Sequence, residues 1–149
     1  MFCKGLSQRL AALAIGLGWK MMVPNNLRYA ETHEWVSVEG DVATIGITKF
    51  AVEQLTDLVF VEMKKAGKTV AVKEPVGQVE SVKSVNDVYA PVAGEIVAKN
   101  DAIEKDTAIV TADPFGKGWM VKIKMSSKSD IDKLLTPAQY ETQIASQGH

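Results

Sequence analysis

Apolar and polar residues alternate along much of the chain, and glycine or proline interrupts the alternation. In EWVSVEGDVATIGIT, residues 34–48, two alternating runs flank Glu39-Gly40-Asp41. A period of two indicates strands, and glycine permits a tight turn, so this segment predicts a β-hairpin. Five later runs also indicate strands: LVFVEM (58–63), KTVAV (68–72), VGQVESV (76–82), GEIVAK (94–99) and GWMVKIKM (118–125).

Helical spacing replaces the alternation in three places. TKFAVEQLTD, residues 48–57, predicts a helix with Thr48 as its N-cap. Ser129 is expected to cap a second helix over DIDKLL, residues 130–135. A third helix over PAQYETQIAS, residues 137–146, begins with proline, which is favoured at the first helical position.

Short strands separated by glycine and proline predict a mainly β fold, a small antiparallel sandwich or flattened barrel with additional short helices. The chain has 149 residues, of which 46% are hydrophobic, enough for one domain and a short appendage. We therefore expect a leader over residues 1–24 and a single domain over residues 25–149, ending in a helical segment.

The leader is basic, has no acidic residue and is moderately apolar. On a helix, five of its apolar side chains fall within an arc of about 80°: Phe2, Leu6, Leu10, Leu13 and Leu17. This profile favours a mitochondrial transit peptide and hence the matrix. The alternatives are a secretory signal, disfavoured by Arg9 beside the apolar run and by the lack of an A-x-A-like site, and an ordinary N-terminal helix packed on the body.

Charge narrows the range of partners. Residues 31–149 hold 13 basic and 18 acidic residues, a balance of −5. A mildly acidic body argues against nucleic acid or an anionic membrane as a partner. No apolar stretch reaches the roughly 20 residues that cross a bilayer.

The reactive side chains of the body do not form a pattern typical of an enzyme active site. Cys3 is the only cysteine, and the histidines are His33 and the terminal His149. A Cys/His dyad and an ordinary zinc site therefore cannot form in the body, and neither a GxGxxG motif nor a P-loop is present. His33 is interpreted as structural, and we expect no catalytic residue and no metal.

One lysine stands out. VGQVESVKSVNDVYAPV, residues 76–92, predicts strand, turn and strand with Lys83 at the bend, among small polar residues that favour a turn. The flanking valines are expected to fix both strands to the core: Val79, Val82, Val85 and Val88. A lysine presented outward from a rigid platform suits modification by another enzyme.

ESVKS together with the downstream APVAGEI resembles the lipoyl-lysine hairpin. Over about residues 27–142 the chain is similar to the H-protein family of the glycine cleavage system, through these segments in order: YAETHEWV, EGDVATIGIT, LVFVEM, VGQVESVK, APVAGEI, DPFGKGW and KIKM. The resemblance implies a lipoyl/biotinyl-type fold with extra terminal helices, lipoic acid in amide linkage on Lys83, and no catalytic activity of the carrier alone.

The resemblance also implies partners. The glycine decarboxylase (P protein) loads the arm with the aminomethyl group of glycine, the aminomethyltransferase (T protein) removes it, and dihydrolipoamide dehydrogenase (L protein) reoxidises the dithiol. A lipoylating enzyme attaches the arm, and the carrier is expected to be a monomer. Family members fold the loaded arm into a cleft, whose residues match Thr32, Glu34 and Asp87 here.

The chain departs from the family pattern at four places. Residues 106–114 lack the usual Asn-Pro, Lys117 replaces an acidic residue, Ser84 replaces a common alanine, and residues 71–75 lack a customary glycine. These departures affect loop geometry and partner surfaces more than the modification itself.

Other functions of the lysine hairpin are also compatible with the sequence. A lipoyl domain of a 2-oxoacid dehydrogenase usually has Ala/Pro-rich linkers, which are missing here. A biotin carrier favours methionine on both sides of the lysine, where Val82 and Ser84 stand. A lipoyl donor that relays the group to other complexes and a non-lipoylated interaction module of the same fold are the remaining alternatives.

Overall fold

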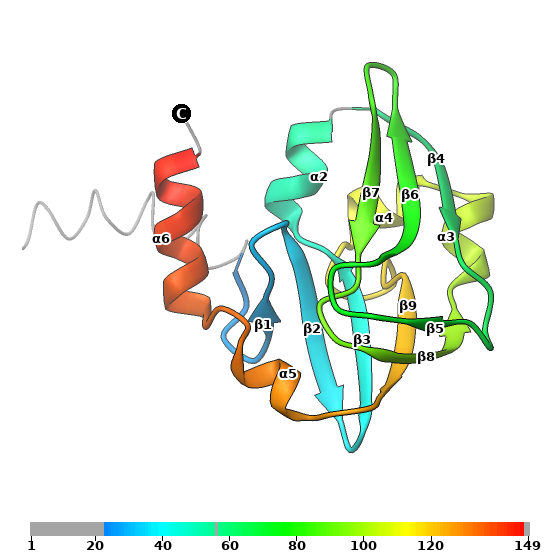
Figure 1. Ribbon diagram of the computed structural model, residues 1–149. Helices are drawn as coiled ribbons and strands as arrows, with labels where there is room; N and C mark the ends of the chain where they lie inside the picture. The colour runs from blue at the N-terminus through cyan, green and yellow to red at the C-terminus, as the bar shows by residue number, and fades with distance from the viewer. Residues whose placement is uncertain (1–22, 56, 148–149) are drawn as a thin grey trace, which may run out of the picture.

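The computed structural model describes residues 23–55 and 57–147, which form two antiparallel sheets with short helices around them (Figure 1). The larger sheet has the order β1-β2-β3-β9-β8-β5 and the smaller one the order β4-β6-β7. The strands of the larger sheet are β1 (Arg28–Tyr29), β2 (Glu34–Glu39), β3 (Val42–Ile47), β9 (Val121–Met125), β8 (Gly94–Lys99) and β5 (Thr69–Val70). Those of the smaller sheet are β4 (Leu58–Met63), β6 (Pro75–Ser81) and β7 (Val85–Tyr89).

The two sheets enclose one apolar core. Val36, Ile45 and Ile123 from the larger sheet and Val61 and Val79 from the smaller sheet belong to a single cluster, and each is at most 2% exposed. Burying a valine or isoleucine fully contributes about 1.5–3 kcal/mol, so this interface holds the sheets together. The predicted mainly β, sandwich-like fold is confirmed; the strands form two separate sheets and do not close into a barrel.

The first predicted hairpin is confirmed. Strands β2 and β3 pair from Glu34↔Ile47 to Glu39↔Val42, and Gly40 in the bend has φ +65°. The predicted helix after it is α2 (Lys49–Leu55), and the Thr48 hydroxyl accepts a hydrogen bond from the amide of Ala51 at 3.2 Å. The N-cap role of Thr48 is therefore also confirmed.

The C-terminal helix α6 (Pro137–Gln147) packs over β1 and is also confirmed. Tyr140 stacks on Tyr29 with ring centroids 4.6 Å apart. Its hydroxyl lies 2.7 Å from the Thr48 hydroxyl and 2.8 Å from Nδ1 of His33. His33, which also packs on the Phe50 ring, thus helps to join α6 to the body, as a structural histidine does.

The capping role predicted for Ser129 is wrong. Helix α5 (Ser129–Asp132) already includes Ser129, and the N-cap position is Lys128. The helix also ends before Leu134 and Leu135. The reason is tertiary, because the backbone of Leu135 exchanges two hydrogen bonds with Tyr29, at 2.7 and 3.0 Å, which draws this segment out of the helix.

Two predicted strands are shorter than expected, and two helices were not foreseen. Strand β5 stops at Val70, since the chain turns back at Lys73, which has φ +73°. Strand β9 starts only at Val121. The unforeseen helices are α3 (Asp101–Lys105) and α4 (Ala108–Ala112), each too short to produce a recognisable apolar period.

The predicted transit peptide over residues 1–24 lies almost entirely outside the described residues. Within residues 23–55 and 57–147, no helix is long and apolar enough to cross a membrane.

We expect Gly94→Ala to destabilise the protein far more than Gly40→Ala. Both glycines have positive φ, +156° and +65°, but a Cβ at Gly94 would lie 2.0 Å from the carbonyl oxygen of Lys124, whereas one at Gly40 meets nothing within 4 Å. The backbone term alone costs roughly 1–2 kcal/mol at either position, and the clash adds about 2 kcal/mol or more at Gly94. Chemical denaturation of both variants measures the difference; equal losses would contradict this account.

Candidate functional site

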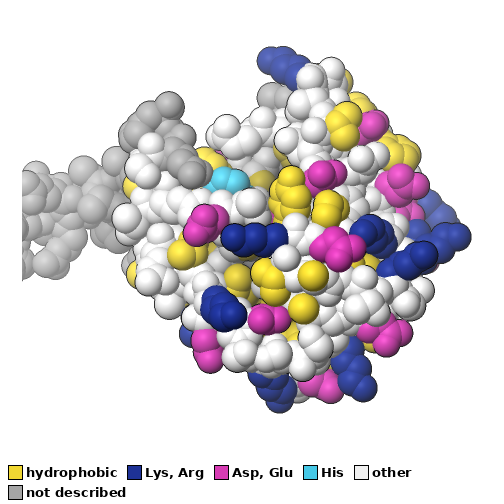
Figure 2. Space-filling view, in the orientation of Figure 1, with side chains coloured by type: hydrophobic (Ala, Val, Ile, Leu, Met, Phe, Trp, Pro, Cys, Tyr) yellow, Lys and Arg dark blue, Asp and Glu magenta, His cyan; other side chains and the backbone are white. Residues whose placement is uncertain are grey.

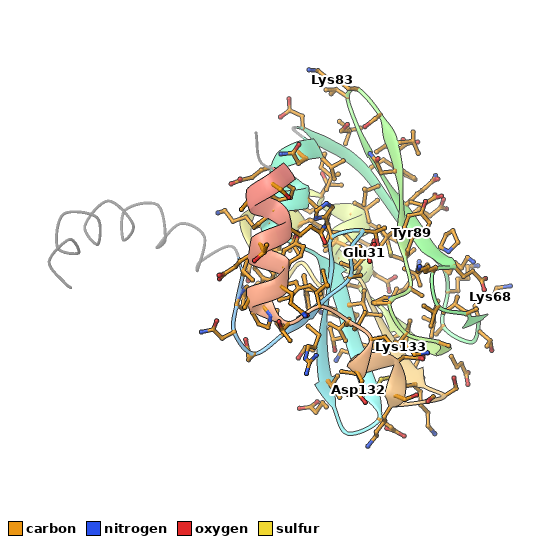
Figure 3. The ribbon with its side chains drawn as sticks, turned by 60° about the vertical axis from the view of Figure 1, so that its left-hand side comes forward. Glu31, Lys68, Lys83, Tyr89, Asp132 and Lys133 are labelled. Atoms are coloured by element: carbon orange, nitrogen blue, oxygen red, sulfur yellow. The ribbon has the colours of Figure 1, made fainter. Side chains whose placement is uncertain are left out.

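Lys83 lies at the tip of the β6–β7 hairpin, as the sequence predicted (Figure 3). One hydroxyl organises the turn: Oγ of Ser81 accepts hydrogen bonds from the amides of Lys83 and Ser84, at 3.3 and 3.2 Å. The amide of Ser81 donates to the carbonyl of Ser84 at 2.8 Å. The turn is thus closed by local hydrogen bonds, and it fixes the backbone from which Lys83 projects.

The hairpin is anchored at two levels. Val79 and Val88 are 2% and 1% exposed and belong to the main core. Nearer the tip, the amide of Val82 donates to the carbonyl of Asp57 in the loop before β4, at 3.1 Å. The prediction that all four flanking valines fix the strands is wrong for two of them, because Val82 and Val85 are 62% and 59% exposed.

The side chain of Lys83 is exposed, and among the described residues its ammonium group forms neither a hydrogen bond nor an ion pair. Lys64 and Lys99, by contrast, pair with Glu74 and Glu104. An amine without a carboxylate partner on a rigid turn is available for acylation by a second protein.

A cavity of about 540 Å³ lies between the end of β7, the β1–β2 loop and the segment around α5. Figure 3 shows three of its polar lining residues, Glu31, Tyr89 and Lys133, between the hairpin tip and α5. Its full lining is Tyr29, Ala30, Glu31, Thr32, Val72, Lys73, Tyr89, Ala90, Pro91, Asp130, Lys133, Leu134 and Leu135. The walls therefore combine apolar surface with charges of both signs.

Glu34 is a buried carboxyl group that joins two walls of this cavity. It is 1% exposed; its Oε1 accepts a hydrogen bond from the hydroxyl of Thr32, and its Oε2 accepts one from the amide of Tyr89 at 3.0 Å. Burial raises the pKa of Glu34 to about 7, because the loss of hydration outweighs the hydrogen bonds that the carboxylate accepts, which act in the opposite direction. The structure thus brings Thr32 and Glu34 together, and their role toward the arm stays a prediction.

Asp87 does not line the same cavity. It lies on the exposed outer face of β7, opposite Gln78, and lines a shallower groove with Glu62, Gln78 and neighbouring residues. Sequence reasoning grouped it with Thr32 and Glu34 by resemblance alone. The structure separates the three into a buried pair and one exposed carboxylate, and the role of Asp87 stays a prediction.

Sequence reasoning missed the cavity's other polar residues. Glu31, Lys73, Tyr89 and Lys133 come from four separated segments, so no local motif connects them. No local signal in the sequence marks them, and the positive φ of Lys73 appears only in the structure.

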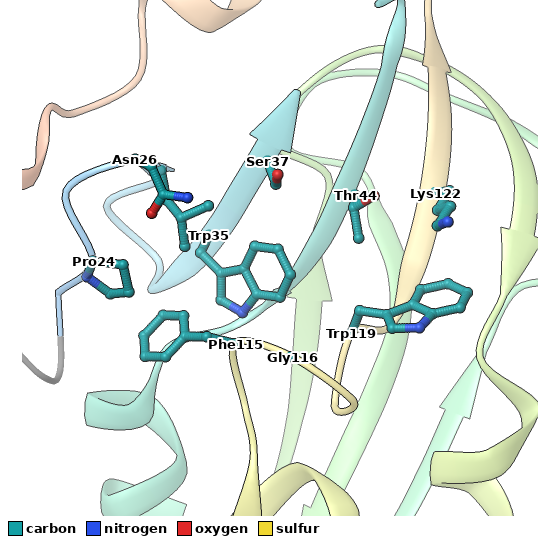
Figure 4. A pocket seen from close by; sticks show the side chains of 10 residues that line it. Pro24, Asn26, Trp35, Ser37, Thr44, Phe115, Gly116, Trp119 and Lys122 are labelled. Carbon is teal, nitrogen blue, oxygen red and sulfur yellow. The ribbon is translucent and has the colours of Figure 1, made fainter. Parts of the chain in front are cut away.

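A second cavity, of about 300 Å³, lies on the outer face of β2, β3 and β9 (Figure 4). Trp35 and Phe115 form one side, and the ammonium of Lys122 lies 5.1 Å from the ring centroid of Trp119 on the other. Nε1 of Trp35 donates to the carbonyl of Pro114 at 2.9 Å. This cavity is bordered by the loop that contains Pro114 and Phe115, and none of its lining residues carries a carboxyl group. Within the described residues, no group of three or more His, Cys, Asp or Glu side chains is placed to bind a metal.

The fold and the lysine hairpin together define a class of protein. An antiparallel sandwich that presents an exposed lysine on a hydrogen-bonded hairpin turn is the architecture of a carrier domain for a covalently attached swinging cofactor. The cavity beside the hairpin is a second element that such a carrier can use.

Comparison with known proteins specifies the family. The family model for glycine cleavage H-protein matches residues 27–147. Glycine cleavage system H proteins of Bacillus mycoides (strain KBAB4) and Bacillus anthracis (strain A0248) are each 48% identical over 120 residues, which are 80% of this chain and 94% of theirs. The crystal structure of a glycine cleavage system H protein from Mycobacterium marinum matches with a TM-score of 0.75 and 36% identity, over 85% of this chain and 100% of that one.

The chain therefore belongs to the glycine cleavage H-protein family. Proteins of this family carry lipoate on a lysine, and this chain is a lipoyl carrier of the glycine cleavage system.

We expect Glu34→Gln to become more stable relative to the unsubstituted protein as the pH rises. The pKa of Glu34 is raised from 4.5 to about 7, so the folded state holds the proton more tightly than the unfolded chain does. Stability from this group is therefore complete below pH 4.5 and falls as the pH rises to about 7. Glutamine cannot ionise, so the difference in free energy of unfolding should grow by about 3 kcal/mol across this window. Urea denaturation at several pH values measures it, and a flat difference would refute the assignment.

Proposed function

We propose that Lys83 is the residue to which the lipoyl group is attached, through an amide bond to its Nζ. The observation that carries the proposal is the exposed, unpaired ammonium of Lys83 at the tip of a hydrogen-bonded turn, in a family whose members carry lipoate on a lysine. The surroundings fit the group, since the tip is open to an acylating enzyme and the adjoining cavity offers apolar walls to an aliphatic chain.

When bound, the lipoyl group supplies the sulfur chemistry that accepts and carries the aminomethyl group of glycine. The protein contributes position and access. Its anchored hairpin holds the attachment point still, and the side chain with the lipoyl chain reaches on the order of 14 Å from the Cα atom at ordinary bond lengths. A tethered group is presented at an effective concentration around millimolar.

We also propose that the loaded end of the arm rests against β7 and the cavity at its base. At about 3.3 Å per strand residue, a reach of about 14 Å corresponds to roughly four residues, which is the level of Asp87. The aminomethyl group at the end of the arm would extend past Asp87 toward Tyr89, whose backbone amide donates a hydrogen bond to Glu34. A cationic amine there would lower the cost of ionising Glu34, since an opposite charge favours the carboxylate. Thr32, Glu34 and Asp87 are the residues we assign to this contact.

As a carrier, the protein would have no catalytic activity of its own and would visit three enzymes in turn. They are the glycine decarboxylase, the aminomethyltransferase and dihydrolipoamide dehydrogenase, the P, T and L proteins of the system. A fourth enzyme attaches the lipoyl group. The acidic balance of residues 31–149, −5 before and −6 after loss of the Lys83 charge, supports encounter with basic entrances on such partners as a monomer.

We propose that residues 1–24 direct the chain to the mitochondrial matrix. The support is the composition of the leader, with three basic and no acidic residues and an apolar face if helical, and the family match begins only at residue 27. Fusion of residues 1–24 to a fluorescent reporter in a eukaryotic cell is expected to give mitochondrial import and cleavage. A diffuse or secreted reporter would contradict the proposal.

Lys83→Arg is expected to abolish lipoylation and glycine turnover. Arginine keeps the positive charge, but its guanidinium stays protonated at neutral pH and is not an acceptor for the lipoyl group. Intact mass of the unsubstituted protein incubated with a lipoylating enzyme should increase by about 188 Da, the composition of the lipoyl group, and the variant should not change. Glycine turnover is then measured with the P, T and L proteins.

Lys68→Arg is the matched control, because Lys68 is exposed but lies at a distance from the hairpin tip (Figure 3). It should keep both the added mass and the turnover. If the Lys83→Arg protein gained the added mass, or supported full glycine turnover, another residue would carry the lipoyl group.

A further inference from the structure

Exposed apolar side chains gather around the lysine hairpin. Seven large hydrophobic residues are exposed in the described part of the chain, and four of them lie on β4 or at the hairpin tip: Val59, Phe60, Val82 and Val85, at 54%, 42%, 62% and 59%. We call these four the apolar collar. The other three lie elsewhere: Val38 on β2, Val72 in the turn after β5 and Val97 on β8.

Strand register gives the collar a shape. Phe60 pairs with Glu80, and Glu80 pairs with Val85, so the three residues form one row across β4, β6 and β7. This row lies on the face away from the core, since the next row, Val61↔Val79, faces inward. Figure 2 shows hydrophobic side chains with acidic ones among them on the upper part of the molecule, over the region of the hairpin and β4.

The collar is held rigidly although it is exposed. The amide of Val82 donates to the carbonyl of Asp57, and the turn that contains Val82 is closed by hydrogen bonds between Ser81 and Ser84. A fixed apolar surface that contributes nothing to the core is a sign of an interaction site. Its position around Lys83 indicates that the partner is one that must approach this lysine.

We propose that the apolar collar is the docking surface for the enzyme that acylates Lys83, and this inference rests on the function proposed above. Nζ of a lysine lies only about 6 Å from its Cα atom at ordinary bond lengths. The acyl carbon must come within about 3 Å of Nζ for reaction. The surface of the acylating enzyme therefore has to close over the hairpin tip and contact Val82 and Val85.

The enzymes that use the finished arm face a different constraint. The arm reaches on the order of 14 Å, so it can enter an active site while the hairpin tip stays at the entrance. The collar is thus required for attachment of the arm and much less for its later use. A matching face on the acylating enzyme would be apolar around the point where the activated acyl group lies.

The step itself balances without a redox partner. The Lys83 ammonium loses a proton to solvent or to a base of the enzyme, and the neutral amine attacks the carbonyl carbon of an activated lipoyl group, either a thioester or a mixed anhydride with a phosphate. As the new C–N bond forms, the nitrogen gives up a second proton to the leaving group or to a base of the enzyme. The bond to the thiol or phosphate then breaks, and that group leaves with its electron pair.

The test compares attachment and use of the arm in one variant. Val82→Thr/Val85→Thr makes the collar polar while it keeps side-chain shape and strand preference, and Val38→Thr/Val97→Thr is the control at similarly exposed valines elsewhere. Thermal unfolding first establishes that both remain folded. Initial rates of acylation are followed by intact mass with a purified lipoylating enzyme and its activated lipoyl substrate.

We expect kcat/KM for acylation to fall about tenfold or more in the collar variant, from the loss of two apolar contacts, and to stay within about twofold in the control. Each protein is then acylated to completion with excess enzyme, and glycine-dependent release of carbon dioxide with the P protein is measured. The fully acylated collar variant should keep at least half of the unsubstituted rate.

Three results would overturn the inference. They are unchanged acylation of the collar variant, an equal fall in the control, and a fall in carbon dioxide release as large as the fall in acylation, which would make the collar a common docking face. Failure of the unsubstituted protein to gain any mass on Lys83 would instead overturn the proposed function, so the two failures are distinguishable.

Discussion

The face-to-face packing of two antiparallel sheets is the interaction on which the site depends. Val79 and Val88 enter the common core from the two strands of the lysine hairpin, and they hold its base against the larger sheet. An isolated hairpin is marginally stable in water, so this anchoring supports the turn that extends beyond the core. The hydrogen bonds of Ser81 then close that turn, so the backbone of Lys83 is fixed while its side chain is free.

A second constraint connects the hairpin to the rest of the body. Glu34 is buried at the start of β2, and it accepts hydrogen bonds from Thr32 in the preceding loop and from the amide of Tyr89 at the end of β7. An ionisable group in this position is a cost to folding near neutral pH, since burial raises its pKa to about 7. A carboxyl group held at such a pKa beside a cavity responds readily to an approaching cation, which fits the carrier role.

The four valines of the lysine hairpin are repeated in the sequence at intervals of three, but they differ in burial. Val79, Val82, Val85 and Val88 look equivalent in the sequence, yet two are in the core and two face solvent. Strand register separates them: Val79 and Val88 face the core, Val85 pairs with Glu80 on the outer face, and Val82 lies in the turn beyond β6. Which valines are anchors and which form the collar depends on where the hairpin leaves the sandwich.

The sequence by itself determined the mainly β class, the first hairpin, helices α2 and α6 and the turn at Lys83. These depend on local periods, caps and turn residues, which act over a few neighbouring positions. The tertiary structure alone decided the end of α5, where Leu135 pairs with Tyr29, and the separation of Asp87 from the buried pair of Thr32 and Glu34. It also assembled the cavity, because residues from distant segments meet only when the sheets pack, and no local rule of spacing encodes such contacts.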